Sequence, residues 1–342
     1  MSWMALTTGR YTMPRSVTLF TGQFADIPLE ELCAKAVSWG YDGLELACWG
    51  DHVDVSRAAK DKKYAKSRKE MLADFGLQLH AISNHLAGQL VLDPNDDARS
   101  DSLAPKDCRG NPSKKRAWAI KQMKDTARAA RNIGVKVVIG FTGSSTWQMF
   151  YAFPPMSDKL IEEGFTYFAK VWNPIFDVYD QCGVKFALEV HANEVAFDVI
   201  TARRALKAVN NRKTFGFNFD PSHLHWQMLD PVAFLRAFPK RIYHVHIKDA
   251  SLTLDGESSI LCSYLNFGQP GRGWDFRTPG RGGIDFEEII RELNQMNYNG
   301  PLSVEWEDAA MDREFGAQEA CEFTRALDFP KSDRVFDEAF GE

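Results

Sequence analysis

Short apolar runs alternate with longer segments of helical periodicity along most of the chain. Leu29, Leu32 and Ala36 recur every three or four residues, which predicts a helix with one buried face. Gly40 follows that segment directly, and a glycine in this position is typical of a helix end. The next run, Gly43 to Ala47, is short and mostly apolar, as expected of a buried strand.

The same succession of helix, glycine and strand recurs toward the C-terminus. The predicted strands are Val17–Thr21, Gly43–Ala47, Leu77–Ser83, Val135–Gly140, Lys185–Val190, Phe215–Phe219, Arg241–Ile247 and Leu302–Trp306. The predicted helices are Pro28–Trp39, Ser56–Phe75, Lys115–Asn132, Ser157–Gln181, Phe197–Val209, Pro231–Phe238, Asp285–Met296 and Asp312–Leu327.

Eight strands that alternate with helices predict parallel pairing and a closed (β/α)8 barrel, the TIM barrel of the α/β class. A doubly wound open sheet would give a similar alternation. That fold more often carries a GxGxxG phosphate loop after its first strand, and the Leu-Phe-Thr-Gly-Gln at 19–23 does not match it. We therefore expect a single TIM barrel domain over residues 1–342.

Two long stretches interrupt the alternation: Asp93–Ser113 is polar, and Ser251–Gly283 is rich in glycine. Both follow predicted strands, so we expect long loops over the C-terminal face of the barrel, where catalytic loops gather. Loops of this length without secondary structure are usually functional or disordered, and we expect lids. In the second stretch, the forked donors of Arg272, Arg277 and Arg281 predict a segment that closes over the substrate.

The composition is that of an ordinary globular protein, with 44% hydrophobic and 25% charged residues. The net charge of −5 gives no general attraction to nucleic acid or to anionic membranes. No apolar run reaches membrane-spanning length, and residues 1–15 lack the apolar core of a signal peptide. The six cysteines are scattered without a CxxC pair, so we expect reduced thiols and a cytoplasmic protein with no nucleic-acid or membrane partner.

Four motifs place a metal-ligand type of residue where a buried strand should end. A carboxylate in such a position is costly to desolvate unless it is paired or binds a cation. A single one is more often a helix cap or half of an ion pair, but four ligand residues at consecutive strand ends indicate a shared ion. We therefore predict one divalent metal bound by Glu189, Asp220, His246 and Glu305.

Three carboxylates and one imidazole form a mostly oxygen donor set. Such a set suits Mn²⁺, Mg²⁺ or Co²⁺ better than a thiolate-preferring ion, and we expect Mn²⁺ ahead of the other two. With only these protein ligands, coordination positions remain for substrate oxygens.

The C-terminal motifs resemble those of the xylose-isomerase-like TIM barrels, which include the sugar phosphate isomerase/epimerase group and the ketose 3-epimerases. The resemblance covers roughly residues 17–327, and its C-terminal half is the more specific. The motifs are Phe-Asp-Pro-Ser-His at 219–223, His-Val-His-Ile-Lys-Asp at 244–249, Gly-Arg-Gly-Gly-Ile-Asp-Phe at 280–286 and Gly-Pro-Leu-Ser-Val-Glu at 300–305.

The resemblance implies that Glu189, Asp220, His246 and Glu305 bind Mn²⁺, Co²⁺ or Mg²⁺. It also implies that the two glutamates act as acid and base on either face of a sugar. The implied activity is isomerisation or epimerisation of a ketose or oxo-sugar through an enediolate, because a metal on the carbonyl oxygen makes the neighbouring proton removable.

Other side chains close to the same strand ends are hypotheses on chemistry alone, since a loop histidine is more often structural. His85 and His52 are candidates for an extra acid or base. The candidates for substrate contact are His191, Glu194, His223, Arg281 and, by stacking on a sugar ring, Trp49. Further candidates are Glu45 at the end of the second strand, His244 on the same strand face as His246, and a Lys248–Asp249 ion pair.

Two other functions stay open. The α subunits of C-glycoside deglycosidases resemble the same barrel and act with a small β-rich subunit. They cleave 3-oxo-glycosides by a related enolisation followed by elimination, as lyases. A non-enzymatic sugar-binding barrel is a third class, although an intact ligand set argues against it. The long loops suit a larger sugar or glycoside, or docking of a second copy of the chain or of a small β-rich subunit.

Overall fold

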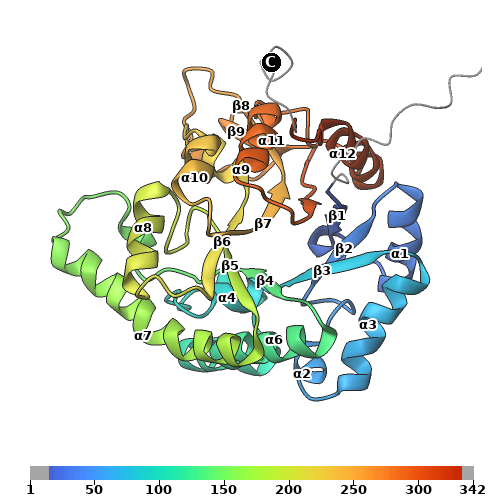
Figure 1. Ribbon diagram of the computed structural model, residues 1–342. Coiled ribbons are helices and arrows are strands. Elements are labelled where there is room, and N and C mark those ends of the chain that lie inside the picture. Colours follow the sequence, from blue (N-terminus) through green and yellow to red (C-terminus); the bar gives the residue numbers. More distant parts are fainter. Residues whose placement is uncertain (1–14, 333–342) are drawn as a thin grey trace, which may run out of the picture.

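The structure, a computed structural model, describes residues 15–332. Eight parallel strands close into a barrel, in the order β1-β10-β7-β6-β5-β4-β3-β2 around it (Figure 1). This arrangement confirms the predicted TIM barrel. The barrel strands are β1 (Val17–Phe20), β2 (Gly43–Ala47), β3 (Gln78–Ser83), β4 (Val137–Gly140), β5 (Lys185–Glu189), β6 (Phe215–Phe219), β7 (Ile242–Ile247) and β10 (Leu302–Val304).

Helices surround the barrel, and the main core lies between them and the strands (Figure 1). The helices are α1 (Leu29–Ser38), α2 (Val55–Ala58), α3 (Lys62–Asp74), α4 (His85–Gln89), α5 (Arg99–Ser102), α6 (Pro112–Ile133), α7 (Asp158–Cys182), α8 (Val199–Ala208), α9 (Pro221–His225), α10 (Pro231–Ala237), α11 (Phe286–Gln295) and α12 (Arg313–Leu327). Aromatic contacts show how the layers join: Trp172 of α7 lies 4.9 Å from Phe186 of β5, and Phe176 lies 5.4 Å from Phe215 of β6, between ring centroids.

The helix predicted over Ser56–Phe75 is two helices, α2 and α3. Asp61 causes the break, because its backbone is extended and its carboxylate accepts the N–H groups of Lys63 and Tyr64. An aspartate in this position starts a new helix by satisfying N–H groups that have no partner within the helix. The other predicted bounds agree with the structure to within three residues.

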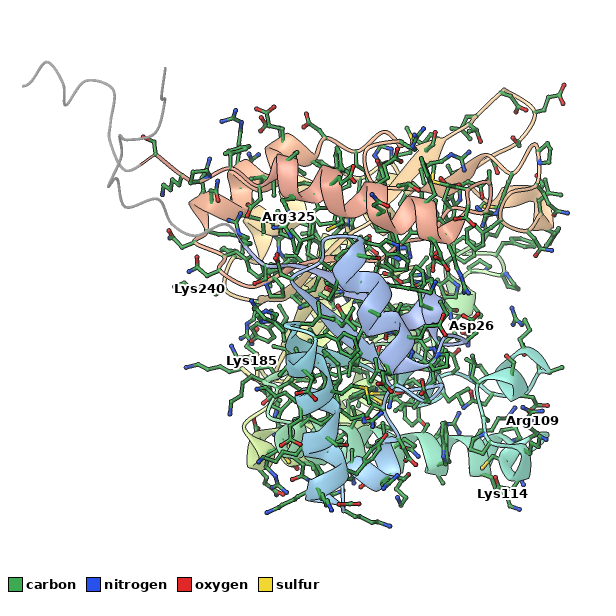
Figure 2. The ribbon with its side chains drawn as sticks, turned by 90° about the vertical axis from the view of Figure 1, so that its right-hand side faces the viewer. Asp26, Arg109, Lys114, Lys185, Lys240 and Arg325 are labelled. Carbon is green, nitrogen blue, oxygen red and sulfur yellow. The ribbon has the colours of Figure 1, made fainter. Side chains whose placement is uncertain are left out.

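Figure 2 shows which end of the barrel the loops occupy. Lys185 and Lys240 lie at the start of β5 and just before β7, at one end of the molecule. Asp26 and Arg109 belong to segments that follow strands, and they lie at the opposite end. The stretch Asp93–Ser113, here called the first insertion, is therefore at the C-terminal end of the barrel, as predicted. It contains α5 and a short turn of 3-10 helix at Lys106–Cys108.

The stretch Ser251–Gly283, here called the second insertion, was predicted to be a loop without secondary structure, and that prediction is wrong. In the structure β8 (Asp249–Leu252) pairs antiparallel with β9 (Trp274–Arg277), outside the barrel. The buried carboxylate of Asp249 accepts the N–H groups of Gly280 at 3.0 Å and Gly282 at 2.8 Å, which fastens the end of the hairpin. Backbone donors thus offset the cost of burying Asp249, in place of the ion pair with Lys248 that the sequence suggested.

The helices of residues 15–332 were also compared with the requirements of a bilayer. None of them combines the length and the apolar character needed to cross a membrane.

We expect Gly282→Ala to lower the free energy of unfolding by about 1–3 kcal/mol. A Cβ here would lie 2.2 Å from Oδ1 of Asp249 and 2.5 Å from the carbonyl oxygen of Ala250, so the turn would have to move. Gly256→Ala is the control, because its Cβ meets no described atom within 4 Å and its φ of +89° adds only a backbone cost. Urea denaturation measures the free energy of unfolding of both variants. Equal losses of this free energy would show that the close contact of Gly282 with Asp249 and Ala250 is not important.

Candidate metal centre

Four buried side chains converge at the C-terminal end of the barrel. Glu189 is the last residue of β5, Asp220 follows β6, His246 lies in β7, and Glu305 follows β10. One ligand atom from each of them lies within 4.8 Å of the ligand atoms of the other three. The strands β5, β6, β7 and β10 are neighbours in the barrel, so their ends bring the four residues together.

The contacts between these side chains leave polar atoms unsatisfied. Nδ1 of His246 lies 2.8 Å from Oε2 of Glu305 and 3.2 Å from Oε2 of Glu189. Within residues 15–332, Oδ2 of Asp220, Oε2 of Glu305 and Nδ1 of His246 have no hydrogen-bond partner of good geometry. Buried carboxylate oxygens without donors are costly, and a shared cation would satisfy all of them. The residues present therefore fit a divalent metal.

The electrostatics of the centre favour positive charge. Burial raises the pKa of Asp220, and the charges of Glu189 and Glu305 raise it further. Burial opposes a charged imidazole at His246, but the charges of Glu45 and Glu305 outweigh it and raise the pKa of that ring. Carboxylates this close cannot all ionise without a compensating cation. The crowding of carboxylates is thus a second reason why the site suits a metal ion.

A buried carboxylate beneath the centre orients one ligand. Glu45 of β2 accepts a hydrogen bond from Nε2 of His246 at 3.1 Å, from Nε2 of His244 at 2.7 Å and from Oγ of Ser303 at 2.7 Å. It also accepts one from Ser83. Because Nε2 of His246 donates to Glu45, Nδ1 is the nitrogen that would bind a metal, and it would lose its proton when the cation takes that proton's place among the carboxylates. Carboxylates commonly hold metal-binding histidines in this way.

Lys248 extends from the end of β7 into the centre. Its Nζ lies 3.4 Å from Oε1 of Glu305 and 3.2 Å from Oε2 of Glu307. Burial opposes the charged ammonium, but Glu305 and Glu307 outweigh it and hold the pKa of Lys248 above its usual value. Of the two glutamates among the candidate ligands, Glu305 therefore has a permanent positive charge beside it and Glu189, in the part of the chain described, does not.

The histidines predicted to act on the substrate separate into two groups. Nε2 of His85 lies 3.1 Å from Oε2 of Glu189, so this ring belongs to the centre. His52 is fully buried, and its ring nitrogens contact Oγ1 of Thr21 at 2.8 Å and the carbonyl oxygen of Ile27 at 3.0 Å. Neither nitrogen of His52 is available to a substrate, so the predicted catalytic role is corrected to a structural one.

The residues predicted to contact the substrate also fall into two groups. Nε2 of His223 lies 3.2 Å from Oε1 of Glu189, and its ring centroid is 4.0 Å from that of His191. Burial, together with the neighbouring His191, lowers the pKa of His223 to about 3, so this ring is neutral. Glu194 instead accepts the N–H groups of Thr142 at 2.6 Å and Gly143 at 2.8 Å with its Oε2. It fastens the loop after β4 with this oxygen, whereas its Oε1 has no hydrogen-bond partner among the described residues, so the contact of Glu194 with substrate stays a prediction.

The arginine-rich segment contacts the centre through an aromatic ring, while Arg272 and Arg281 have partners elsewhere. The guanidinium of Arg281 binds Glu319 of α12 at 2.5 and 2.7 Å, and that of Arg272 stacks 3.9 Å from the ring centre of Phe267. Phe276 of β9 instead packs edge-on against His223, with centroids 5.4 Å apart. The prediction that Arg281 contacts the substrate is therefore corrected.

Further aromatic rings surround the centre. Phe20 stacks on His246 with centroids 5.6 Å apart, and Phe141 packs edge-on against His85 at 4.7 Å. Trp49 lies 6.3 Å from His85, so it stands at the edge of the predicted site. Sequence reasoning missed Phe20, Phe141 and Phe276, because an aromatic residue in an apolar strand or loop carries no sign of which side it faces.

Comparison with known proteins agrees with this architecture. The family model described as xylose isomerase-like TIM barrel matches residues 33–327. The chain belongs to the xylose isomerase-like TIM barrel family. Within this family, the uncharacterized protein YfiH of Bacillus subtilis (strain 168) is 24% identical over 326 residues, covering 88% of this chain and 96% of YfiH.

Two other proteins are similar to this chain, one over a short segment and one in its fold. An inosose dehydratase of Clostridium botulinum (strain Eklund 17B / Type B) is 35% identical over 102 residues, only 30% of this chain and 34% of that enzyme. The solved structure of 3-keto-D-glucoside 4-epimerase, YcjR, from E. coli has a TM-score of 0.63 at 15% identity, covering 91% of this chain and 99% of that one. At that identity the likeness shows the fold alone.

We expect the purified protein to bind one divalent cation per chain, and Asp220→Asn to weaken that binding at least tenfold. The amide cannot supply the negative charge that draws the cation among three carboxylates. Calorimetric titration with Mn²⁺ after chelator treatment measures the affinity. Asp255→Asn, an exposed carboxylate of the second insertion, is the control. Unchanged affinity in Asp220→Asn would rule out this site.

We expect Glu45→Gln to weaken cation binding by about 10- to 100-fold, the usual cost of losing a carboxylate that orients a metal-binding histidine. Ser303→Ala is the matched control, because it removes one donor to Glu45 but leaves the contact with His246. The same Mn²⁺ titration, with thermal unfolding of the cation-free proteins, separates a loss of ligand orientation from a loss of stability. Equal cation affinities in the two variants would contradict the role of Glu45.

Proposed function

We propose that the protein is a metal-dependent sugar isomerase or epimerase that removes a proton beside the carbonyl group of a ketose or oxo-sugar. The observation that carries the proposal is that Glu189 and Glu305 share one centre with Asp220 and His246. Membership in the xylose isomerase-like family supports the broad class of reaction.

Glu189, Asp220, His246 and Glu305 are the residues that would hold the metal, with Mn²⁺ as the proposed ion because the donors are mostly oxygen. When bound, a divalent cation supplies Lewis-acid polarisation of a carbonyl oxygen. The four protein ligands leave room for substrate oxygens in a coordination shell of six.

The strand positions of the two glutamates support roles on opposite sides of a substrate. Glu189 and Glu305 come from β5 and β10, the outer strands of the arc β5-β6-β7-β10, so they flank the other two ligands. A carboxylate on each side can remove a proton from one face of a carbon and return a proton to the other face. This arrangement is what an epimerase requires.

The glutamates differ in their surroundings, which suits different roles. Glu189 contacts His85 at 3.1 Å and accepts an N–H from Asn218 at 3.1 Å. Glu305 accepts an N–H from Gln23 at 3.2 Å and lies beside Lys248. Burial opposes the ionised form of both carboxylates, but the histidines around Glu189 and the ammonium and His246 beside Glu305 lower the pKa of each. Both can therefore start ionised, and they differ in the neighbouring group, a histidine beside Glu189 and a permanent ammonium beside Glu305.

The aromatic rings that surround the centre assist the same chemistry. Phe20, Phe141 and Phe276 pack against ring faces or edges of His246, His85 and His223, respectively. Apolar walls exclude water, which strengthens each electrostatic interaction inside the site and protects a reactive enediolate from side reactions. They also offer flat surfaces for the C–H faces of a sugar ring.

Elimination from an oxo-sugar, a lyase or dehydratase reaction, is the second candidate. The observation that favours it is His85, a buried ring 3.1 Å from Glu189 whose Nδ1 has no hydrogen-bond partner in the described part of the chain. Such a ring can give a proton to a departing oxygen. The local similarity to an inosose dehydratase supports this alternative, which begins with the same proton abstraction.

We expect Glu305→Gln and Glu189→Gln each to reduce turnover by about 10² to 10⁴, the usual cost of losing a general base. An amide retains an oxygen for a cation but takes no proton at neutral pH. The measurement is exchange of ¹H for ²H in D₂O on a panel of ketoses and 3-oxo-glucosides, with cation binding followed separately. Glu319→Gln is the control, because Glu319 pairs with Arg281 on the surface.

The paired result separates the two mechanisms. Loss of exchange in both variants supports epimerisation. Exchange that survives in one variant, with cleavage or dehydration lost only in the other, supports elimination. Exchange that survives in both would refute a carboxylate base.

A further inference from the structure

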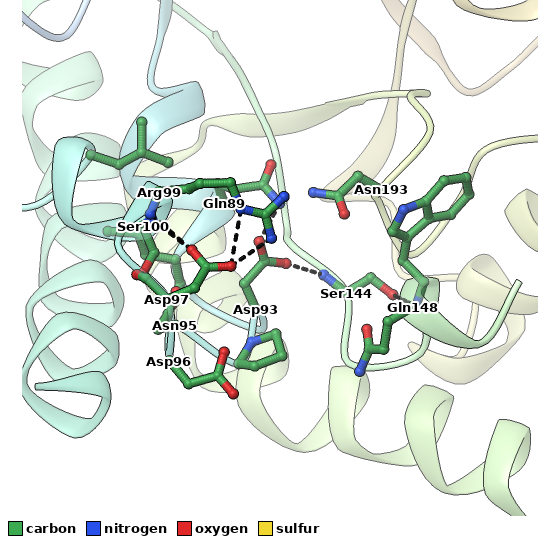
Figure 3. A pocket seen from close by; sticks show the side chains of 14 residues that line it. Gln89, Asp93, Asn95, Asp96, Asp97, Arg99, Ser100, Ser144, Gln148 and Asn193 are labelled. Atoms are coloured by element: carbon green, nitrogen blue, oxygen red, sulfur yellow. Dashed lines mark hydrogen bonds and ion pairs between the residues drawn. The ribbon is translucent and has the colours of Figure 1, made fainter. Parts of the chain in front are cut away.

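Figure 3 shows the residues that line a polar cavity of about 900 Å³. Its walls come from the end of α4, from the first insertion, from the loop after β4 and from Asn193 in the loop after β5. The volume is in the range of cavities that bind small organic molecules. None of the four candidate metal ligands lines it, so its wall offers contacts that the metal centre does not supply.

Two segments of the chain lead directly from the centre to this cavity. Helix α4 begins at His85, which contacts Glu189, and ends at Gln89 on the cavity wall, a rise of about 6 Å. In the loop after β5, Asn193 lines the cavity two residues after His191, which is at most about 7 Å of chain. The cavity therefore begins about one sugar ring away from the reacting groups.

Phe141 marks the boundary between the two spaces. Its ring packs against His85 at 4.7 Å and against His191 at 5.0 Å, on the side of the centre. Three residues further along, Ser144 lines the cavity. A substrate that passes this ring would have one part at the metal centre and another part in the cavity.

The wall of the cavity is rich in neutral hydrogen-bonding groups arranged around one carboxylate. Asp93 accepts the N–H of Ser144 at 3.0 Å and the amide of Gln89 at 2.8 Å, and the side chain of Asn193 also donates to it. Figure 3 shows the side chains of Gln89, Asp93 and Asn193 directed toward one another from three segments. Amide side chains carry both donors and an acceptor, as hydroxyl groups of a ligand require.

Asn95 provides independent evidence for a ligand. It lines the cavity and is only 3% exposed, and its Nδ2 donates to the carbonyl oxygen of Leu90 at 2.7 Å. Its Oδ1 has no hydrogen-bond partner among the residues that the structure describes. A buried acceptor without a donor is costly, and a hydroxyl group of a ligand would satisfy it.

The charges and the remaining wall residues narrow the chemical class of ligand that the cavity can bind. Asp93, Asp96 and Asp97 line the cavity, and the guanidinium of Arg99 already donates to Asp97 at 3.0 Å. The excess of negative charge disfavours a phosphate or a carboxylate. Trp147 adds a flat apolar surface on which the C–H face of a sugar can stack.

We infer that this cavity binds a second, uncharged sugar ring of the substrate, so that the protein acts on an oxo-glycoside of at least two rings and not on a free monosaccharide. The inference rests on the proposed function for the identity of the first ring. It adds the substrate class: the reacting ring lies at the metal centre, and the ring that does not react is held by Asn193, Gln148 and Ser144.

The test compares one-ring and two-ring ligands that cannot react. Methyl β-D-glucoside and methyl β-cellobioside lack the carbonyl group, so their binding to the Mn²⁺-loaded protein is measured by calorimetry without turnover. We expect the two-ring glycoside to bind about tenfold more tightly. Asn193→Gly, which tolerates the φ of +80° at this position, should reduce that advantage by about three- to tenfold through lost hydrogen bonds.

Two further variants make the result specific. Gln148→Ala removes a second polar group of the cavity wall and should act in the same direction. Asn210→Gly is the matched control, since Asn210 is exposed, has a φ of +54° and lies before β6, at the opposite end of the barrel. It should change neither affinity.

The inference is overturned if both glycosides bind equally, if Asn193→Gly weakens both to the same extent, or if neither glycoside binds. Proton exchange on oxo-sugars tests the proposed function separately. Binding of the two-ring glycoside without exchange would leave the cavity assignment standing and refute the proposed reaction. Exchange without a two-ring advantage would do the reverse.

Discussion

Burial of several carboxylates at one end of a closed barrel is the constraint on which the rest of the structure depends. Glu189, Asp220 and Glu305 are each at most 5% exposed, so bulk water does little to stabilise their charge. Each uncompensated buried charge would cost several kcal/mol, comparable with the whole stability of a domain. Compensation comes from Lys248 beside Glu305, from His246 between the carboxylates, and from donor atoms that a cation would complete.

Other buried carboxylates in the same barrel receive their hydrogen bonds from different kinds of donor. Glu194 and Asp249 accept backbone N–H groups, and both fasten loops at the C-terminal end. Glu45 accepts from histidine and serine side chains inside the barrel. Asp220 accepts from Ser222 with Oδ1 only, and its Oδ2 has no donor in residues 15–332. Glu194 also leaves one oxygen, Oε1, without a donor, so an unsatisfied oxygen alone does not mark a candidate ligand. Asp220 differs because it lies among the ligand atoms of Glu189, His246 and Glu305.

The sequence could predict the barrel and the convergence of the four candidate ligands because both are encoded locally. A buried strand is a short apolar run, and a ligand at its C-terminal end stands out as the one charged group after that run, as in Leu188-Glu189. Barrel closure then brings consecutive strand ends together without further information. The positions of His52 and Arg281 looked equally suitable, but their partners, Thr21 and Glu319, are distant in sequence. The direction of a loop side chain depends on such partners, which no local pattern reveals.

The same difference between strand ends and loops separates the residues proposed for the reaction from those proposed for substrate specificity. The strands determine where the candidate metal ligands lie, and in the proposed function a bound cation would activate the carbonyl of a sugar there. The insertions build what surrounds them: the β8–β9 hairpin brings Phe276 over His223, and the segment after α4 supplies Asp93 and Asn95 to the neighbouring cavity. Because loops tolerate changes in length that strands do not, a centre for one ring can acquire space for a longer ligand without moving a metal ligand. Under the proposed function, the insertions would therefore set the size of the substrate, while the barrel would set the bond that reacts.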